Sequence, residues 1–306
     1  MSSSREVGGR QVFPVGMGGA PIAFSASRPD EGGARAVVHA ALDAGVRLFD
    51  TADVYSPHLG AGYSERVIAE AIAERPSIEH EVLVATKGGK YWARDGSVQV
   101  DGRPSYLHQA CRASLKALGA ERIWLYQLHA PCPDVPLEES VGALVELREA
   151  GLVEHIGLSN VDVAQIRAAS AVTAIASVQN RLGPDHRVGA PELACCEELG
   201  IAFLPYQPLG GVVGPSAGSA PAAPFWEVAA RHGVSPARAA LAWELSLSSV
   251  VLPIPGATRA TSIADSAGAA CLELSEDDLA LLGGLADGPV AAPGAPAPPH
   301  PAKERS

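Results

Sequence analysis

Four side chains capable of acid–base chemistry follow three short apolar runs of this chain. Asp50 comes directly after the run at 46–49, with Tyr55 five residues beyond it. Lys87 follows the run at 81–86, and His129 follows the run at 122–128. If these runs are parallel strands, an ion pair between Asp50 and Lys87 would fix the ammonium group, and its charge would lower the pKa of Tyr55. His129 would then orient a carbonyl oxygen and Tyr55 would protonate it, which predicts metal-free carbonyl reduction by a hydride donor.

The elements that position these residues alternate between apolar runs and alanine-rich segments of helical period. The expected strands cover residues 13–17, 46–49, 81–86, 122–128, 153–158, 174–178, 201–204 and 250–254. The expected helices cover 31–44, 64–74, 105–118, 136–150, 163–170, 191–199 and 236–247, with one more from residue 260. About eight such units with apolar strands predict an α/β fold, a single (β/α)8 TIM barrel with its site at the C-terminal mouth of the strands. A doubly wound sheet is the alternative, but Gly16-Met17-Gly18-Gly19 lacks the GxGxxG spacing of its first turn.

Composition limits the classes of protein that this chain can belong to. It has 306 residues, 47% hydrophobic and 19% charged, which excludes a wholly disordered chain. A net charge of −11 argues against nucleic acid and anionic membranes as partners. There is no apolar run of membrane-spanning length and no signal-like start. The five cysteines are odd in number and lack CxxC spacing, so we expect reduced thiols, no metal site and a cytoplasmic protein.

We expect one domain over residues 1–286. The segment 214–224 is rich in Gly, Pro, Ala and Ser and is expected to be a loop. Residues 287–306 form a Pro/Ala-rich tail that is expected to be disordered.

The segments around these side chains resemble the aldo-keto reductase family. The likeness covers, in family order, residues 50–55, 87–89, 128–129, 157–160, 177–181, 205–211 and 254–259. By this resemblance Tyr55 is the proton donor, and Asp50, Lys87 and His129 are its partners. Within the family, residues 125–131 resemble those of bacterial reductases similar to the pyridoxal reductases and related sugar or aldehyde reductases. A cofactor-binding regulatory subunit with little turnover, which also occurs in the family, is the alternative function.

The resemblance also implies NADPH as the cofactor, with NADH possible. Ser159, Asn160 and Gln179 match residues that bind the nicotinamide carboxamide, and Tyr206 matches the ring that stacks on the nicotinamide. The following segment, with Gln207, Leu209 and Gly210, would approach the pyrophosphate. Gly256, Thr258 and Arg259 would hold the adenosine 2′-phosphate, and Asp265 would accept a hydrogen bond from the adenine amine. Ser262 and Ser266 replace residues that are basic or amides in many family members, which weakens the expected preference for NADPH over NADH. Arg259 still favours NADPH.

The substrate is expected to be a small carbonyl compound. Four residues of the strand-end loops are candidates for the pocket wall: Phe24, His58, Tyr91 and Trp92. The protein is expected to be a monomer or a small homo-oligomer.

Overall fold

The computed structural model describes residues 4–24, 27–55, 58–210, 212–213 and 222–284. The strands are β1 (Arg5–Val7), β2 (Arg10–Val12), β3 (Met17–Gly18), β4 (Leu48–Asp50), β5 (Leu83–Gly88), β6 (Lys90–Trp92), β7 (Val98–Val100), β8 (Ile123–Leu128), β9 (Val153–Ser159), β10 (Ser177–Gln179) and β11 (Ala202–Phe203). The helices are α1 (Ala20–Phe24), α2 (Glu31–Asp43), α3 (Tyr63–Ala73), α4 (Pro104–Leu118), α5 (Leu137–Glu149), α6 (Val163–Val172), α7 (Ala190–Leu199), α8 (Ala223–His232), α9 (Pro236–Leu247), α10 (Ala260–Ala267) and α11 (Glu276–Leu282). The tail at 287–306 and most of the loop at 214–224 lie outside these residues, and Ala223 begins α8.

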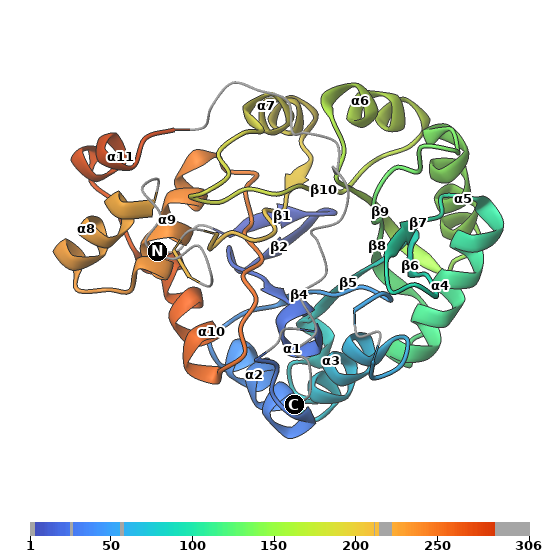
Figure 1. Cartoon of the computed structure of the whole chain (residues 1–306), viewed down its shortest axis with the longest axis horizontal. Coiled ribbons are helices and arrows are strands. Elements are labelled where there is room, and N and C mark those ends of the chain that lie inside the picture. The colour runs from blue at the N-terminus through green and yellow to red at the C-terminus, as the bar shows by residue number, and fades with distance from the viewer. Residues whose placement is uncertain (1–3, 25–26, 56–57, 211, 214–221, 285–306) are drawn as a thin grey trace.

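Seven of these strands form one parallel sheet in the order β11-β10-β9-β8-β5-β4-β3. The segment at 250–256 closes it, because Phe203 of β11 bridges Val251 and Gly18 of β3 bridges Gly256, both in parallel. Pro253 and Pro255 have no N–H to donate, so this eighth segment is joined by isolated bridges rather than a regular ladder. Figure 1 shows the helices as a ring around these strands. The predicted (β/α)8 barrel is confirmed.

A hairpin of β1 and β2 packs against one end of the barrel interior. Its Val7 and Val12 belong to the same buried cluster as Leu48, Leu83 and Leu125, which are near the starts of their strands. The Arg5 guanidinium donates to the carbonyl of Val251 at 2.9 Å and to that of Leu245 at 2.9 Å. The hairpin therefore covers the amino-terminal end of the barrel and leaves the carboxyl ends of the strands to form the site.

Several helix boundaries follow local capping chemistry. Asp30, Asp162, Ser235 and Ser275 each accept a backbone N–H in the first turn of α2, α6, α9 and α11. Gly119 and Gly200 end α4 and α7 in the left-handed region, at φ 63° and 67°. The predicted helices are present with ends shifted by a few residues. The hairpin of β1 and β2, the short α1, the hairpin of β6 and β7, α8 and α11 are additions to the predicted elements.

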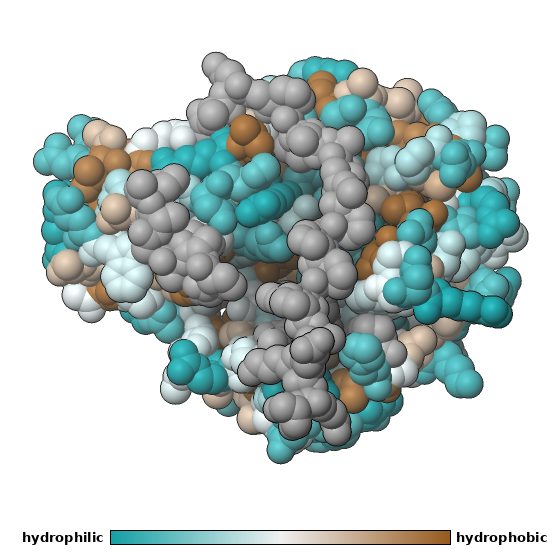
Figure 2. All heavy atoms as spheres, viewed as in Figure 1, coloured by the Kyte–Doolittle hydropathy of each residue, from teal (hydrophilic) through white to brown (hydrophobic). Residues whose placement is uncertain are grey.

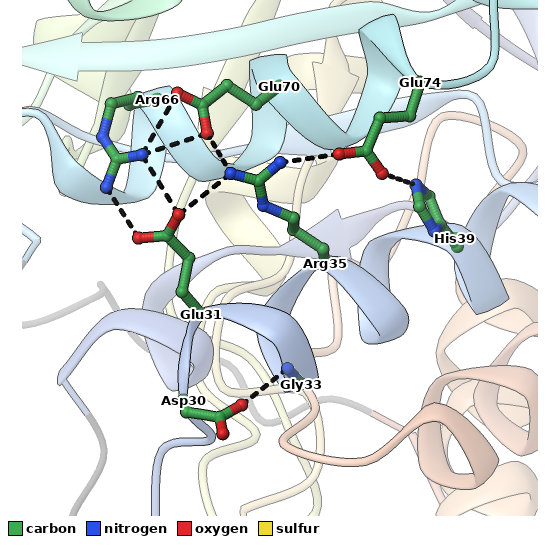
Figure 3. Close-up of polar contacts among 8 residues, drawn as sticks. All are labelled: Asp30, Glu31, Gly33, Arg35, His39, Arg66, Glu70 and Glu74. Carbon is green, nitrogen blue, oxygen red and sulfur yellow. Dashed lines mark hydrogen bonds and ion pairs between the residues drawn. The ribbon is translucent and has the colours of Figure 1, made fainter.

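An ion-pair network joins the outer faces of α2 and α3 (Figure 3). Arg35 pairs with Glu31 at 2.9 Å and with Glu74 at 2.6 Å, and Arg66 pairs with Glu31 at 2.9 Å. The side-chain hydrogen bonds from Arg66 and Arg35 lower the pKa of Glu31 to about 2. Because these side chains are partly exposed, at 29–44%, solvent screens the ion pairs, and the network orients the two helices more than it stabilises the fold.

The outer helices carry mostly hydrophilic residues at the periphery of the face in Figure 2, with scattered hydrophobic ones between them. Among the helices that the structure describes, none combines the length and apolar character needed to span a bilayer.

Glu244 of α9 is fully buried, and neither of its carboxylate oxygens has a hydrogen-bond partner among the described residues. Burial raises its pKa well above the ordinary 4.5, so the folded state keeps a proton that the unfolded state releases above that pH. The free energy of unfolding therefore falls as pH rises from about 4.5 towards the folded-state pKa, by up to about 1.4 kcal/mol per pH unit. We expect Glu244→Gln to remove this loss.

Urea unfolding at pH 6 and pH 7.5 measures this effect. The free energy of unfolding of Glu244→Gln, taken relative to the parent, should be higher at pH 7.5 than at pH 6. The same difference for Glu197→Gln, at an exposed position of α7, should not change with pH. An equal difference between variant and parent at both pH values would show that Glu244 is ionised in the folded state.

Candidate active site

The strand register places the four expected acid–base residues at one end of the barrel. Asp50 is the last residue of β4 and Lys87 is the fifth of the six in β5. Lys87 is opposite Gln127 of β8, and His129 is the first residue after that strand. Because parallel strands carry their carboxyl ends to the same rim, these side chains converge there. The structure brings all four together.

Lys87 is fully buried and its ammonium group has three acceptors. Nζ donates to Asp50 Oδ2 at 2.6 Å, to the carbonyl of Thr51 at 2.8 Å and to the Tyr55 hydroxyl at 3.4 Å. Burial lowers the pKa of Lys87, but the negative charge of Asp50 and the hydrogen bonds to Asp50 and Tyr55 outweigh this effect and leave the pKa above its ordinary value. The ammonium is therefore a fixed charge beside the phenol.

The pKa of Tyr55 is above its ordinary value, which corrects the sequence-based expectation. Burial raises it, and the neighbouring Lys87 charge lowers it by less. The expectation considered the ammonium and left out the cost of placing a phenolate in a buried site. Tyr55 is thus protonated at neutral pH, the state that a proton donor needs.

His129 is buried, and its pKa is well below the ordinary value because of burial and the charges of Lys90 and Lys87. Its ring centroid lies 6.0 Å from that of Tyr55, with the planes at 80°. The ring nitrogen Nδ1 has no hydrogen-bond partner in the part of the chain that the structure describes. A neutral imidazole here can donate one N–H to a carbonyl oxygen, and it cannot act as a strong acid.

Two buried amides hold the second oxygen of Asp50. Gln127 Nε2 donates to Asp50 Oδ1 at 3.0 Å, and Gln179 Nε2 donates to the same atom at 2.8 Å. Sequence reasoning missed Gln127 and gave Gln179 a different role, as a contact of the nicotinamide. The available signal was a glutamine inside the otherwise apolar run at 122–128, because a buried amide must find a partner.

Two adjoining cavities open at this end of the barrel. The central cavity is about 880 Å³ and is lined by Asp50, Tyr55 and His129, among others. The outer cavity is about 860 Å³ and is lined by Trp226 of α8, by the start of α9 and by α10. Pro21, Leu209, Val213 and Gly256 line both, so the two form one extended groove.

All the residues expected to bind the cofactor line this groove. Ser159, Asn160, Gln179, Tyr206, Gln207, Leu209, Gly210 and Gly256 line the central cavity, and Thr258, Arg259 and Asp265 line the outer one. Two of them, Asn160 and Gln207, have left-handed backbone conformations at φ 59° and 54°. Non-glycine residues rarely adopt these values, and they concentrate at functional sites.

The amide of Asn160 links the two halves of the central cavity. Its Nδ2 donates to the carbonyl of His129 at 2.9 Å, and its Oδ1 accepts from the Tyr206 hydroxyl at 2.7 Å. Asn160 thereby fixes the Tyr206 ring relative to the loop that carries His129.

Two residues have partners that the sequence did not suggest. A Cβ built on Gly210 would lie 2.2 Å from Asp185 Oδ1, so the glycine makes room for that carboxylate. Asp265 Oδ1 accepts from Arg238 at 2.7 Å, and its Oδ2 accepts from Ser235. The Asp265 carboxylate is thus engaged by α9.

Arg259, at the start of α10, lines the outer cavity. Arg259 is exposed, and the described residues offer it neither an ion pair nor a side-chain hydrogen bond. Trp226 of α8, which sequence reasoning missed, lines the same cavity with 49% of its surface exposed. Its position in a helix absent from the expected elements explains the omission.

The four residues expected to form the wall of the substrate pocket have different positions relative to the central cavity. Phe24 is the last residue of α1, and its side chain is outside the described residues. His58 is exposed, and His58, Tyr91 and Trp92 are not among the lining residues of the central cavity. The Trp92 indole donates to the carbonyl of Val54 at 2.9 Å and ties β6 to the loop that carries Tyr55. Lys90, which the sequence analysis did not single out, does line the cavity.

Cysteines and acidic residues suggest no further chemistry at this site. All five cysteines are free, and all but Cys271 are buried. Within the described ranges, no group of three His, Cys, Asp or Glu side chains is arranged to hold a metal ion.

The closed barrel and the tyrosine–lysine pair at its mouth define a class of oxidoreductases that act on carbonyl groups. Comparison with known proteins agrees, since the sequence model described as "Aldo/keto reductase family" matches residues 14–287. The chain belongs to the aldo/keto reductases, which are NAD(P)H-dependent oxidoreductases, and the predictions of family and class are confirmed.

The similar proteins cover nearly all or most of the chain. Pyridoxine 4-dehydrogenase of Escherichia coli is 32% identical over 93% of this chain and 98% of its own length. A probable aldo-keto reductase of Glycine max is 35% identical over 79% of this chain and 76% of its own. The crystal structure of a Klebsiella pneumoniae aldo/keto reductase in complex with NADP and acetate matches with a TM-score of 0.77 and 25% identity, over 92% of this chain and 94% of that one.

Proposed function

We propose that this oxidoreductase reduces an aldehyde or ketone to an alcohol with NADPH, and that Tyr55 supplies the proton. The observation that carries the proposal is the Tyr55 hydroxyl, which accepts from Lys87 Nζ in a cavity shared with His129. Intact proton-transfer groups favour an enzyme over the regulatory subunit, because binding alone would need none of them.

The groove fits a nicotinamide dinucleotide. The exposed guanidinium of Arg259 at the start of α10, which has no ion pair among the described residues, suits a 2′-phosphate, and the exposed Trp226 indole suits an adenine face. Tyr206 and the carboxamide-binding candidates Ser159, Asn160 and Gln179 lie at the other end of the groove, beside the acid–base residues. NADPH supplies the hydride when bound.

The protein's own groups manage the oxygen of the substrate. His129, neutral because of burial, would donate an N–H to the carbonyl oxygen and orient it. Tyr55 would transfer its proton to the same oxygen as negative charge develops there. The Lys87 ammonium would stabilise the resulting phenolate, and Asp50 holds that ammonium in place.

Loss of absorbance at 340 nm with purified protein, NADPH and a panel of aldehydes tests this function. Turnover of about 1 to 100 per second would be ordinary for an enzyme. Tight cofactor binding without turnover across the panel would instead support the regulatory subunit.

The affinities for NADPH and NADH test whether Arg259 binds the 2′-phosphate of the cofactor. Arg259→Ala should weaken NADPH binding about tenfold, the worth of about 1.5 kcal/mol for a charge-assisted contact, and should leave NADH binding within about twofold. Titration of both cofactors by quenching of intrinsic fluorescence measures this. Equal affinities of the two cofactors for the parent protein would contradict the assignment.

A further inference from the structure

Lys90 places a second ammonium group in the central cavity. It is the first residue of β6 and is half-buried, and it lines the cavity with Tyr55 and His129. Gly89 precedes it at φ 103°, a conformation that favours glycine and turns the chain from β5 into β6. The carbonyl of Lys90 accepts from the Tyr106 hydroxyl at 3.0 Å, so the backbone that carries this side chain is held in place.

No anion balances this charge among the described residues. Lys87 has Asp50 at 2.6 Å, and Arg181 of the same cavity has Asp185 at 3.3 Å, whereas Lys90 Nζ has neither an ion pair nor a hydrogen bond there. Burial and the charge of Lys87 lower the pKa of Lys90 to about 8. An unbalanced, partly desolvated cation favours a ligand that brings a negative charge to it.

The sheet order separates Lys90 from the residues proposed to hold the nicotinamide. The residues proposed to hold the nicotinamide come from β9, from β10 and from the segment after β11. Lys90 follows β5, which is separated from β9 by β8 in the sheet, and its charge acts on His129. Lys90 therefore lies among the acid–base residues that follow β4, β5 and β8, on the other side of β8 from the proposed nicotinamide contacts, where a substrate would bind.

We propose that Lys90 is a specificity-determining residue that selects carbonyl substrates bearing a carboxylate. The proposal rests on the proposed function, because it names the substrate class of the same site. The carboxylate would pair with Lys90 while His129 and Tyr55 engage the carbonyl oxygen. Neutral carbonyl compounds would bind without that ion pair and react less efficiently at low concentration.

A matched pair of aldehydes tests the proposal. 4-Carboxybenzaldehyde and methyl 4-formylbenzoate differ mainly in the charge, so the ratio of their kcat/KM values reports the anion selectivity. We expect the parent protein with NADPH to favour the carboxylate at least tenfold at pH 7. Lys90→Met should lower this ratio at least tenfold, mainly through KM of the carboxylate, and Lys90→Arg should keep most of it. Lys116→Met, at an exposed position of α4, is the control for net charge and should not change the ratio.

A ratio that is the same in Lys90→Met and the parent would overturn the proposal, as would a parent that favours the ester. If the parent reduces neither aldehyde, the proposed function is in question and binding decides the proposal separately. Calorimetric titration with 4-(hydroxymethyl)benzoate, the alcohol related to the first aldehyde, should then show at least tenfold weaker binding to Lys90→Met. Equal affinity, or no binding to the parent, would overturn it.

Discussion

Tyr55→Phe is expected to lower turnover by about 10²- to 10⁴-fold, the usual contribution of a general acid. The change keeps the ring beside His129 and removes the hydroxyl that accepts from Lys87. Since the proposed phosphate and adenine contacts lie in the outer cavity, cofactor affinity should change little. Single-turnover hydride transfer with a reactive aldehyde, alongside a cofactor titration, measures both quantities.

The control for this experiment is Tyr91→Phe, which removes the hydroxyl of an exposed tyrosine of β6. It should leave hydride transfer close to that of the parent. Near-normal hydride transfer in Tyr55→Phe would show that another group donates the proton. Loss of cofactor affinity in that variant would show that the ring has a binding role.

Lys87→Met should reduce both turnover and stability. It removes the charge that stabilises the Tyr55 phenolate, so turnover should fall by an amount similar to that for Tyr55→Phe. It also leaves Asp50 buried without its cation, which typically costs about 3–5 kcal/mol of unfolding free energy. Both side chains are nearly inaccessible, at 0% and 3% exposure, so solvent offers little compensation. Denaturant unfolding and steady-state kinetics on the same preparation measure the two effects.

A double variant separates the lost ion pair from the orphaned charge. Asp50→Asn combined with Lys87→Met removes both charges and should recover part of the stability lost in Lys87→Met, with turnover still low. A double variant no more stable than Lys87→Met would show that the loss comes from packing of the lysine stem rather than from an unpaired carboxylate.

The sequence predicts the barrel because nearly all the expected strands are largely apolar and the expected helices have a helical period. It does not predict β1, β2, β6 and β7, since strands of three residues carry too little periodicity to distinguish from loops. α8 was missed because it begins in a segment with the composition of a loop, and packing of Phe225 against Trp243, at 5.5 Å between ring centroids, holds it in place.

Residue types at strand ends predicted Asp50, Lys87 and His129 as one group, since that depends on topology alone. The direction of the Tyr55 pKa shift was wrong because it depends on how deeply the phenol is buried. The positioning amide Gln127 and the bonds of Asp265 to α9 were not predicted, because they depend on side-chain contacts between segments far apart in sequence. Lys90 faces the cavity owing to the turn at Gly89, which no periodicity signals.

The two prolines in the segment that closes the barrel have a mechanical consequence. This junction is held by scattered bonds, such as those from Gly16 to the carbonyl of Pro253 and from Leu252 to that of Phe203, both at 2.9 Å. Because the two prolines donate no N–H, this junction has fewer backbone bonds than a regular ladder of the same length would have. Gly256 ends the segment and lines both cavities, so a molecule lying along the groove would span this seam. A molecule bound in the groove would then contact both sides of this junction, so the rigidity of the barrel would depend on whether its ligand is bound.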